Sequence, residues 1–370
     1  MASSNGNRKQ KPNARKKAAK PSKTPEQKKR RNQQIIGVIL IVVAIFVQAG
    51  GFFLDKLNLV QFNRGFDASQ TKRASEVGAG ELAGEKYIGR YPGMPTGNIY
   101  RDKNVINILL LGTDDRTTRF DDGVRSDSMM MVSIDTKKNS VKLVSFERAI
   151  GVPILEGQYK GQVDWLTHCF CYGNADLVMK ELQACFLLDV NRYIRTNILC
   201  FMELINIVGG VDIELTPAEA NYINTDDHCE DLGYKVRSKK QYAKPGVNHM
   251  NGTTAMIYAR CREVDSDWGR MGRQRTVVTK VFEKVQNMSP TELNDAINKM
   301  MPLVMTNLTK GEMATLIFEL PGLTSTTVET MVIPEKGAMT SMLGMEGRSV
   351  FWPNYRKNAK DLKEFLYDID

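Results

Sequence analysis

The stretch VINILLLGTDDR, residues 105–116, decides the fold of this 370-residue chain. Its apolar run is broken only by Asn107 and is typical of a strand that is buried on both faces of a sheet. Two more strands are indicated by SMMMVSI at 128–134 and VKLVSF at 141–146, and the polar residues between them predict a hairpin with a loop of four to six residues. We therefore expect three neighbouring strands of one sheet.

Helices and strands alternate after this hairpin. Apolar residues at helical spacing predict a helix over 174–188 with Asn174 as its N-cap, and strands are expected at 193–196 and 211–215 around a helix at 201–208. The remaining expected elements are helices near 250–260, 269–287, 290–304 and 310–319, a strand near 327–334 and a terminal helix from Asn354. This alternation predicts an α/β fold, an α-β-α sandwich around a mixed central sheet.

One segment before the sheet is long enough to cross a membrane. Residues 35–54, IIGVILIVVAIFVQAGGFFL, are twenty residues without a charge, and as a helix they span about 30 Å of hydrocarbon. A signal peptide cleaved after Ala49 is the alternative. Because Lys and Arg crowd the residues before this transmembrane helix, the positive-inside rule places 1–34 in the cytoplasm and 55–370 outside the cell.

The formal net charge of +9 is unevenly distributed. Residues 1–33 contain twelve Lys or Arg and one acid, so the other 337 residues carry a net charge of −2. The basic tail, residues 1–34, has no apolar periodicity and is expected to be disordered. Its charge could indicate a nucleic-acid partner, but the adjacent membrane span and the weakly acidic body disfavour one. A Gly-rich connector at 55–104 leads to a folded domain at 105–370.

Six cysteines follow the membrane segment. They are Cys169, Cys171, Cys185, Cys200, Cys229 and Cys261. Since disulfides are the default outside the cytoplasm, this even count predicts three bridges whose pairing the sequence does not fix. The alternative is a metal site made from His168, Cys169, Cys171, His228 and Cys229, although their spacing matches no known zinc pattern.

Acids and arginines lie at the ends of the first strands. Asp114 follows the first strand, Arg125 and Asp127 lead into the second, and Arg148 follows the third. If these loops share one edge of the sheet, the charges converge. Convergent carboxylates suit Mg²⁺, which accepts one or two of them and completes its shell with water and phosphate. Loop charges that are simply exposed to solvent are the alternative.

A second group of cations lies in the second half of the chain. Arg260 lies at the end of a predicted helix and Arg262 follows it, and Arg270 and Gln274 lie on one face of the next helix because they are four residues apart. Arginine can grip phosphate oxygens with two N–H groups, and a helix N-terminus offers further N–H groups to the same ligand. An ordinary surface helix would interleave acids, and none lies between Arg270 and Lys280.

Seven motifs occur in a fixed order along the chain. They are NILLLG with TDDR (107–116), RSDSMMMVSI (125–134), VKLVSFER (141–148), YGNADLVMKEL (172–182), GGVDIEL (209–215), GVNHMNGTTAMIYARCR (246–262) and DWGRMGRQR (267–275). In this order they resemble the LytR-CpsA-Psr family of bacterial cell-envelope enzymes. The resemblance covers residues 105–285 and extends more weakly over 286–370, and a cytoplasmic tail with one membrane span is the usual layout of the family.

The resemblance implies a Mg²⁺-dependent phosphotransferase in the bacterial cell membrane. Family members transfer anionic glycopolymers, such as teichoic acid or capsular polysaccharide, from undecaprenyl pyrophosphate to peptidoglycan through a phosphodiester bond. By resemblance, Asp114 and Asp127 hold Mg²⁺, for which Mn²⁺ can substitute, and act in catalysis with Arg148. The implied pyrophosphate-binding residues are Arg125, Arg148, Arg260, Arg262, Arg270 and Gln274. One of the two acids, or Asp115, would accept the proton of the sugar hydroxyl, and the polyprenyl tail would need an apolar pocket.

Two departures from the family pattern leave other functions open. The family has an Arg-Asp pair where this chain has Arg148 and Ala149, and it has a Lys in the segment where this chain has Gln162. A protein without these charges could bind the lipid carrier and regulate wall assembly without transfer. It could also hydrolyse the pyrophosphate, since water can replace the sugar hydroxyl in the same geometry.

Overall fold

The computed structural model describes residues 61–62, 91–115, 120–225, 242–319, 328–335 and 337–369. The chain divides into two compact units, residues 1–53 and 54–370, and all described residues belong to the second. The expected basic tail at 1–34, the transmembrane helix at 35–54 and most of the connector at 55–104 lie outside the described residues. Among the described residues, no helix combines the length and the apolar character needed to cross a membrane.

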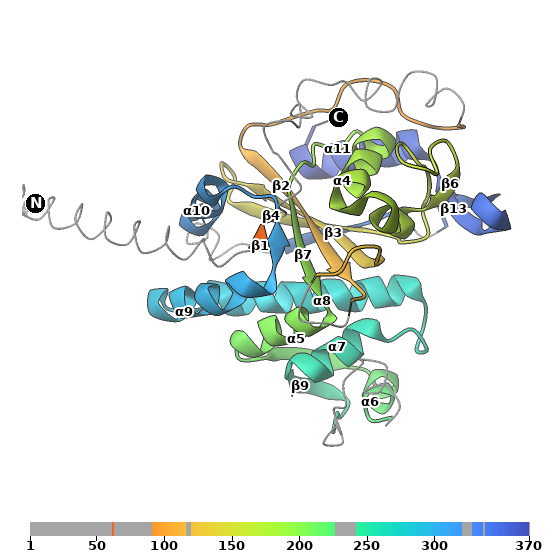
Figure 1. Cartoon of the computed structure of the whole chain (residues 1–370). Coiled ribbons are helices and arrows are strands. Elements are labelled where there is room, and N and C mark those ends of the chain that lie inside the picture. The colour runs from red at the N-terminus through yellow and green to blue at the C-terminus, as the bar shows by residue number, and fades with distance from the viewer. Residues whose placement is uncertain are drawn as a thin grey trace, which may run out of the picture. The chain divides into compact units, whose positions relative to one another are not determined.

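A seven-stranded mixed sheet forms the centre of this unit (Figure 1). Its order is β1-β10-β7-β2-β3-β4-β11, with β1 at Gln61–Phe62, β10 at Met305–Thr306, β7 at Tyr193–Asn197, β2 at Val105–Thr113, β3 at Ser126–Asp135, β4 at Ser140–Phe146 and β11 at Val328–Ile333. Strands β2, β3 and β4 are antiparallel neighbours, whereas β7 and β11 lie parallel to β2 and β4. The predicted mixed sheet and its central hairpin are confirmed.

Helices cover both faces of the sheet (Figure 1). The described α-helices are α4 (Leu166–Phe186), α5 (Ile198–Ile207), α6 (Pro217–Ile223), α7 (Gly252–Arg260), α8 (Asp267–Gln286), α9 (Pro290–Met300), α10 (Lys310–Glu319) and α11 (Tyr355–Tyr367). Helix α4 begins earlier than expected, and the predicted N-cap Asn174 lies with Gly173 at a kink inside it. The terminal helix α11 begins as predicted, because the side chain of Asn354 caps it.

Alternation along the strands assigns one set of side chains to each face. Leu109, Met131 and Tyr193 are buried against α4 and α11 in the main core. Their neighbours Leu110 and Ile194 face the opposite side, where they pack near α9 and α10. Since successive residues of a strand point to opposite faces, the strands that build the core also present a second apolar surface. That second apolar surface forms one wall of the cavity described below.

Three two-stranded antiparallel sheets outside the main sheet were not expected from the sequence. They join β5 (Gly151–Pro153) to β6 (Val163–Trp165), β8 (Val211–Leu215) to β9 (Gly246–Met250), and β12 (Met339–Leu343) to β13 (Ser349–Pro353). Only the strand at 211–215 was predicted. Two short 3₁₀ helices, Met301–Leu303 and Met345–Gly347, complete the described elements.

The expected framework of three disulfides is wrong. Cys169, Cys171, Cys185, Cys200 and Cys261 are free thiols, and Cys229 lies outside the described residues. Four of the five are buried and act as small apolar residues. Burial raises the pKa of Cys169 and Cys185 well above the ordinary value, which keeps these thiols protonated. Within the described ranges, no group of three His, Cys, Asp or Glu side chains is placed to hold a metal.

Candidate functional site

A cavity of about 640 Å³ lies between the second face of the sheet and helices α5, α7 and α8. All eight site residues expected from the sequence line it, namely Asp114, Arg125, Asp127, Arg148, Arg260, Arg262, Arg270 and Gln274. They come from segments up to 160 residues apart in the chain. The fold therefore brings together the two groups of charged residues that the sequence analysis had separated.

The strand directions explain how the first group converges. Strands β2 and β4 end where β3 begins, because β3 is antiparallel to both. Asp114 after β2, Asp127 at the start of β3 and Arg148 after β4 therefore share one edge of the sheet. A register shift between Gly112 and Thr113 bends the end of β2 at this edge.

Asp114 and Arg125 form a closed pair at the rim of this edge. Oδ1 of Asp114 accepts from the backbone N of Arg125 at 3.0 Å, and Oδ2 lies 3.3 Å from Nη2 of the same residue. The backbone N of Asp114 donates to the carbonyl oxygen of Arg125 at 3.1 Å. The Arg125 side chain is 51% exposed, so solvent screens this pair and its guanidinium can exchange to another anion.

Three arginines converge on Asp267, in the first turn of α8. Its carboxylate lies 3.0 Å from Nε of Arg148, 3.4 Å from Nε of Arg262 and 3.4 Å from Nε of Arg270. Asp127 takes two further donors, since Nη1 of Arg148 lies 3.5 Å from its Oδ1 and Nη1 of Arg270 reaches its carbonyl oxygen at 3.5 Å. The sequence analysis did not assign Asp267 to the site, although its position one turn before Arg270 was a usable signal.

Burial and neighbouring charges shift the ionisation of these groups. Burial and the like charges of Arg262 and Arg148 lower the pKa of Arg270 to about 10, against the attraction of Asp267. Burial also acts to lower the pKa of Arg148, but Asp267 and Asp127 outweigh it and the net shift is upward. Both guanidinium groups therefore stay charged at neutral pH. The site therefore contains a cluster of permanently charged arginines.

The two departures from the family pattern, Ala149 and Gln162, do not line the cavity. The backbone N of Ala149 donates to Oε1 of Glu147 at 3.4 Å, and Glu147 is fully buried. Burial and the negative charge of Asp267 raise the pKa of this glutamate. A buried acid thus stands directly before Arg148, where the family pattern has one directly after it.

Asp115 does not take part in the cavity. It is buried, and its carboxylate accepts from Nη2 of Arg195 at 3.3 Å and from Nδ2 of Asn197 at 3.2 Å. Arg195 also donates to Oγ1 of Thr113 and to the carbonyl oxygen of Asp121. These contacts hold the loop that carries Asp114. This position does not support Asp115 as the acceptor of the substrate proton, because Asp115 is not among the residues that line the cavity and both of its oxygens are paired.

The cavity changes from charged to apolar along its length. On α8, Arg270, Gln274, Val278 and Val281 all line it, and their spacing places them on one helix face. The change runs over eleven residues, or about 16 Å of helix. The other apolar lining residues are Leu110, Leu111, Met130, Ile194, Ile198, Phe201, Leu204, Met256, Ile257, Ala259 and Val304. Such a cavity fits a ligand with an anionic head and a hydrocarbon tail.

The amino-acid sequence of this chain is similar to those of known proteins. The model of the LytR_cpsA_psr family matches residues 69–364. The polyisoprenyl-teichoic acid–peptidoglycan teichoic acid transferase TagU of Bacillus cereus is 31% identical over 211 residues, which are 56% of this chain and 62% of that protein. The chain thus spans about three fifths of the length of this curated relative.

Solved structures share the fold. The crystal structure of B. subtilis TagV has a TM-score of 0.56 and 26% identity over 72% of this chain and 98% of that one. The LytR-CPS2A-psr family protein YwtF (TagT) with bound octaprenyl pyrophosphate lipid has a TM-score of 0.50 and 21% identity over 71% of this chain and 91% of that one. The mixed sheet with helices on both faces is therefore a shared architecture.

Proposed function

Because the chain belongs to the LytR_cpsA_psr family, we propose that it is a phosphotransferase that moves an anionic glycopolymer, of the teichoic acid or capsular polysaccharide type, from polyprenyl pyrophosphate to peptidoglycan. The observation that carries this proposal is the cavity in which five arginines meet an apolar wall. A ligand with several negative charges and a long hydrocarbon tail matches both parts. The name of TagU, a polyisoprenyl-teichoic acid–peptidoglycan teichoic acid transferase, supports this substrate class.

The pyrophosphate head would lie against Arg148, Arg262 and Arg270. These arginines project from the end of β4, the segment after α7 and the first turn of α8, so they can surround an anion from several directions. Arg260 and Gln274 also line this part, and Arg125 stands at its rim. The octaprenyl pyrophosphate bound to YwtF (TagT) supports such a ligand here.

Transfer requires one bond to form and one to break. The oxygen of a peptidoglycan hydroxyl attacks the phosphorus that carries the glycopolymer, and the bond from this phosphorus to the bridging oxygen breaks. Polyprenyl phosphate leaves with the electron pair, and the hydroxyl proton passes to a carboxylate, Asp114 or Asp127. The arginines stabilise the charge that accumulates on the leaving phosphate, because phosphoryl transfer depends mostly on positioning and electrostatics.

Mg²⁺ fits the chemistry of the two carboxylates. Asp114 and Asp127 would hold it, since both line the cavity and their side chains are 27% and 33% exposed, which leaves room for water and phosphate oxygens. The metal would supply positive charge to the phosphate oxygens, and Mn²⁺ accepts the same ligands. The arginines that surround these acids bind the phosphate oxygens whether or not the metal is present.

The location follows from the sequence outside the described residues. We place residues 35–54 in the bacterial cell membrane as a single span, with 1–34 in the cytoplasm and the cavity outside the cell. The uncharged run and the twelve preceding cations support this orientation. Both substrates are available there, because the lipid carrier lies in the membrane and peptidoglycan lies outside it.

A transfer assay with the full chain tests the proposal. The chain in detergent micelles is mixed with a labelled glycan on polyprenyl pyrophosphate, peptidoglycan fragments and Mg²⁺, and both labelled peptidoglycan and free polyprenyl phosphate are measured. We expect Arg148→Ala to reduce transfer at least about a hundredfold. The matched control is Arg192→Ala, because Arg192 pairs with Glu312 and does not line the cavity.

Three outcomes separate the candidate functions. Labelled peptidoglycan that requires Arg148 supports the transferase. Release of polyprenyl phosphate without labelled peptidoglycan identifies a hydrolase, and tight binding of the lipid without release identifies a carrier-binding regulator. Either of the last two results contradicts the proposal.

A further inference from the structure

Asp267 is the point at which three arginines of the site meet, although it does not line the cavity itself. Arg148, Arg262 and Arg270 line the cavity, and the Nε of each lies within 3.4 Å of the Asp267 carboxylate, to which the Nε of Arg148 donates a hydrogen bond. Contact through Nε leaves the terminal Nη groups to other partners, and two of these reach Asp127. Asp267 therefore contacts the cavity arginines without lining the cavity itself.

The position of Asp267 is fixed by a buried anchor. Ser266 caps α8, and its hydroxyl accepts from the backbone N of Gly269. Arg273, one and a half turns later and only 4% exposed, donates to Oδ1 of Asp265 at 2.7 Å and to the carbonyl oxygen of Cys261 at 2.8 Å. These bonds tie the segment before α8 to the helix. The capped first turn of α8 thus holds the Asp267 carboxylate close to the arginines.

Three guanidinium groups this close repel one another. The low pKa of Arg270 reflects that repulsion together with its burial. A single carboxylate between them offsets one charge and holds the others in place before a ligand arrives. Such an acid also weakens the attraction of the cluster for a pyrophosphate, because it contributes negative charge at short range.

We infer that Asp267 is a positioning residue that orients the three arginines and limits their affinity for pyrophosphate, so that the phosphate product can leave. This inference rests on the proposed function. Asp267 is unsuited to be the base, since it does not line the cavity and its carboxylate already lies beside three guanidinium groups. Its effect on the reaction passes through the arginines.

Removal of the charge should strengthen binding and slow turnover. In Asp267→Asn, Arg148 keeps its ion pair with Asp127 and Arg270 keeps its hydrogen bond to the Asp127 carbonyl oxygen, whereas Arg262 and Arg270 each lose their ion pair with Asp267. The cluster therefore stays together with one negative charge fewer. We expect inorganic pyrophosphate to bind the full chain about tenfold more tightly, and this gain should shrink as ionic strength rises. We expect kcat for transfer to fall at least about tenfold.

Two further variants distinguish charge from position. Asp267→Glu keeps the charge and displaces it, so it should bind pyrophosphate as the wild type does and still have a reduced kcat. Asp212→Asn is the matched control, because Asp212 is an exposed acid that pairs with Lys284 and His249 away from the cavity. It should leave the pyrophosphate affinity, kcat and Tm unchanged.

Calorimetric titration with inorganic pyrophosphate, the transfer assay and thermal unfolding are measured on the same preparations. Tighter pyrophosphate binding with lower kcat and a Tm close to that of the wild type supports the inference. Unchanged binding, or binding and kcat that fall together, overturns it. If the wild type shows no transfer, the proposed function fails, whereas the pyrophosphate titrations of wild type and Asp267→Asn still decide whether Asp267 limits the affinity.

Discussion

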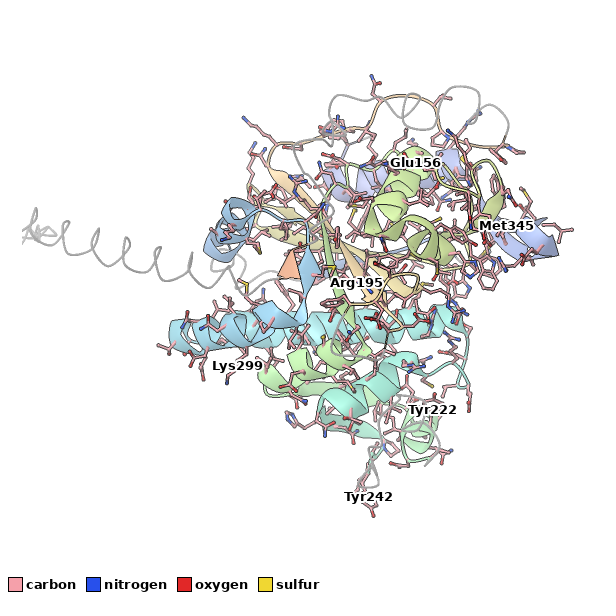
Figure 2. All side chains as sticks on the ribbon, viewed as in Figure 1. Glu156, Arg195, Tyr222, Tyr242, Lys299 and Met345 are labelled. Carbon is pink, nitrogen blue, oxygen red and sulfur yellow. The ribbon has the colours of Figure 1, made fainter. Side chains whose placement is uncertain are left out.

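Asp114 and Asp115 are neighbours in the chain, but one lines the cavity and the other is buried in an ion pair. Asp114 lines the cavity, is 27% exposed and pairs with the half-exposed Arg125. Asp115 is buried and pairs with Arg195, which lies near the centre of the folded unit (Figure 2). The guanidinium of Arg195 lies 5.1 Å and 4.9 Å from the rings of Phe120 and Phe170.

The difference between these two acids separates binding from folding. A solvated and loosely paired carboxylate can be offered to a metal or a substrate at little cost. A buried carboxylate whose two oxygens both accept hydrogen bonds stabilises the fold. Removal of one member of a buried ion pair leaves the other charge buried without a partner. The following experiments contrast the cavity with this buried pair, beginning with the largest expected effect.

The buried pair should dominate stability. Asp115→Ala leaves Arg195 buried without its carboxylate, so we expect the free energy of unfolding to fall by about 3–5 kcal/mol. Urea denaturation of the full chain in detergent, followed by tryptophan fluorescence, measures this loss. A loss below about 1 kcal/mol would contradict the assignment of Asp115 to the fold.

The exposed neighbour should dominate activity instead. Asp114→Asn removes a cavity carboxylate and changes little of the core, so we expect transfer to fall about a hundredfold while Tm stays within about 2 °C of the wild type. The transfer assay and thermal unfolding are run on one preparation. If Asp114→Asn destabilises the chain as strongly as Asp115→Ala, the division between the two acids does not hold.

The apolar part of the cavity should affect the tail of the ligand only. Phe201→Ala removes an aromatic ring from the lining, so we expect the affinity for polyprenyl pyrophosphate to fall about tenfold. The affinity for inorganic pyrophosphate should not change, because this anion has no tail. Equal losses for both ligands would show that the apolar part does not bind the tail.

The smallest effect should come from Glu147, the buried acid directly before Arg148. Burial raises the folded-state pKa of Glu147, so folding favours its protonated form and stability is lost as pH rises from the unfolded pKa to the folded one. Glu147→Gln cannot ionise and avoids this loss. We expect its Tm to exceed that of the wild type by about 2 °C at pH 7 and to match it near pH 4. An equal gain at both pH values would contradict this cause.

The sequence was sufficient for the parts of the fold that repeat a local pattern. Short apolar runs bounded by polar residues predicted β2, β3 and β4, and the terminal helix begins at Asn354 as expected. The pair β12–β13 was missed because β12 is mostly exposed and both strands are only five residues long. The start of α4 was misplaced because Asn174 has the residue type of an N-cap but lies at a kink between two helical stretches.

The site was predictable where residue type alone carries the chemistry. The arginines and Gln274 were found because phosphate binding favours them, and the fold gathered all of them in one cavity. Asp267 was missed because its importance depends on its contact with Arg148, which lies 119 residues earlier. The disulfide prediction failed because it relied on compartment, whereas these thiols are placed by packing in the core.

The most direct test of the central claim is an experimental structure of the full chain with a polyprenyl pyrophosphate. Our account predicts phosphate oxygens within hydrogen-bond distance of Arg148 and Arg270, with the hydrocarbon tail against Val278 and Val281. A lipid bound elsewhere, or a head group that contacts neither arginine, would contradict the claim that this one cavity holds both parts of the carrier.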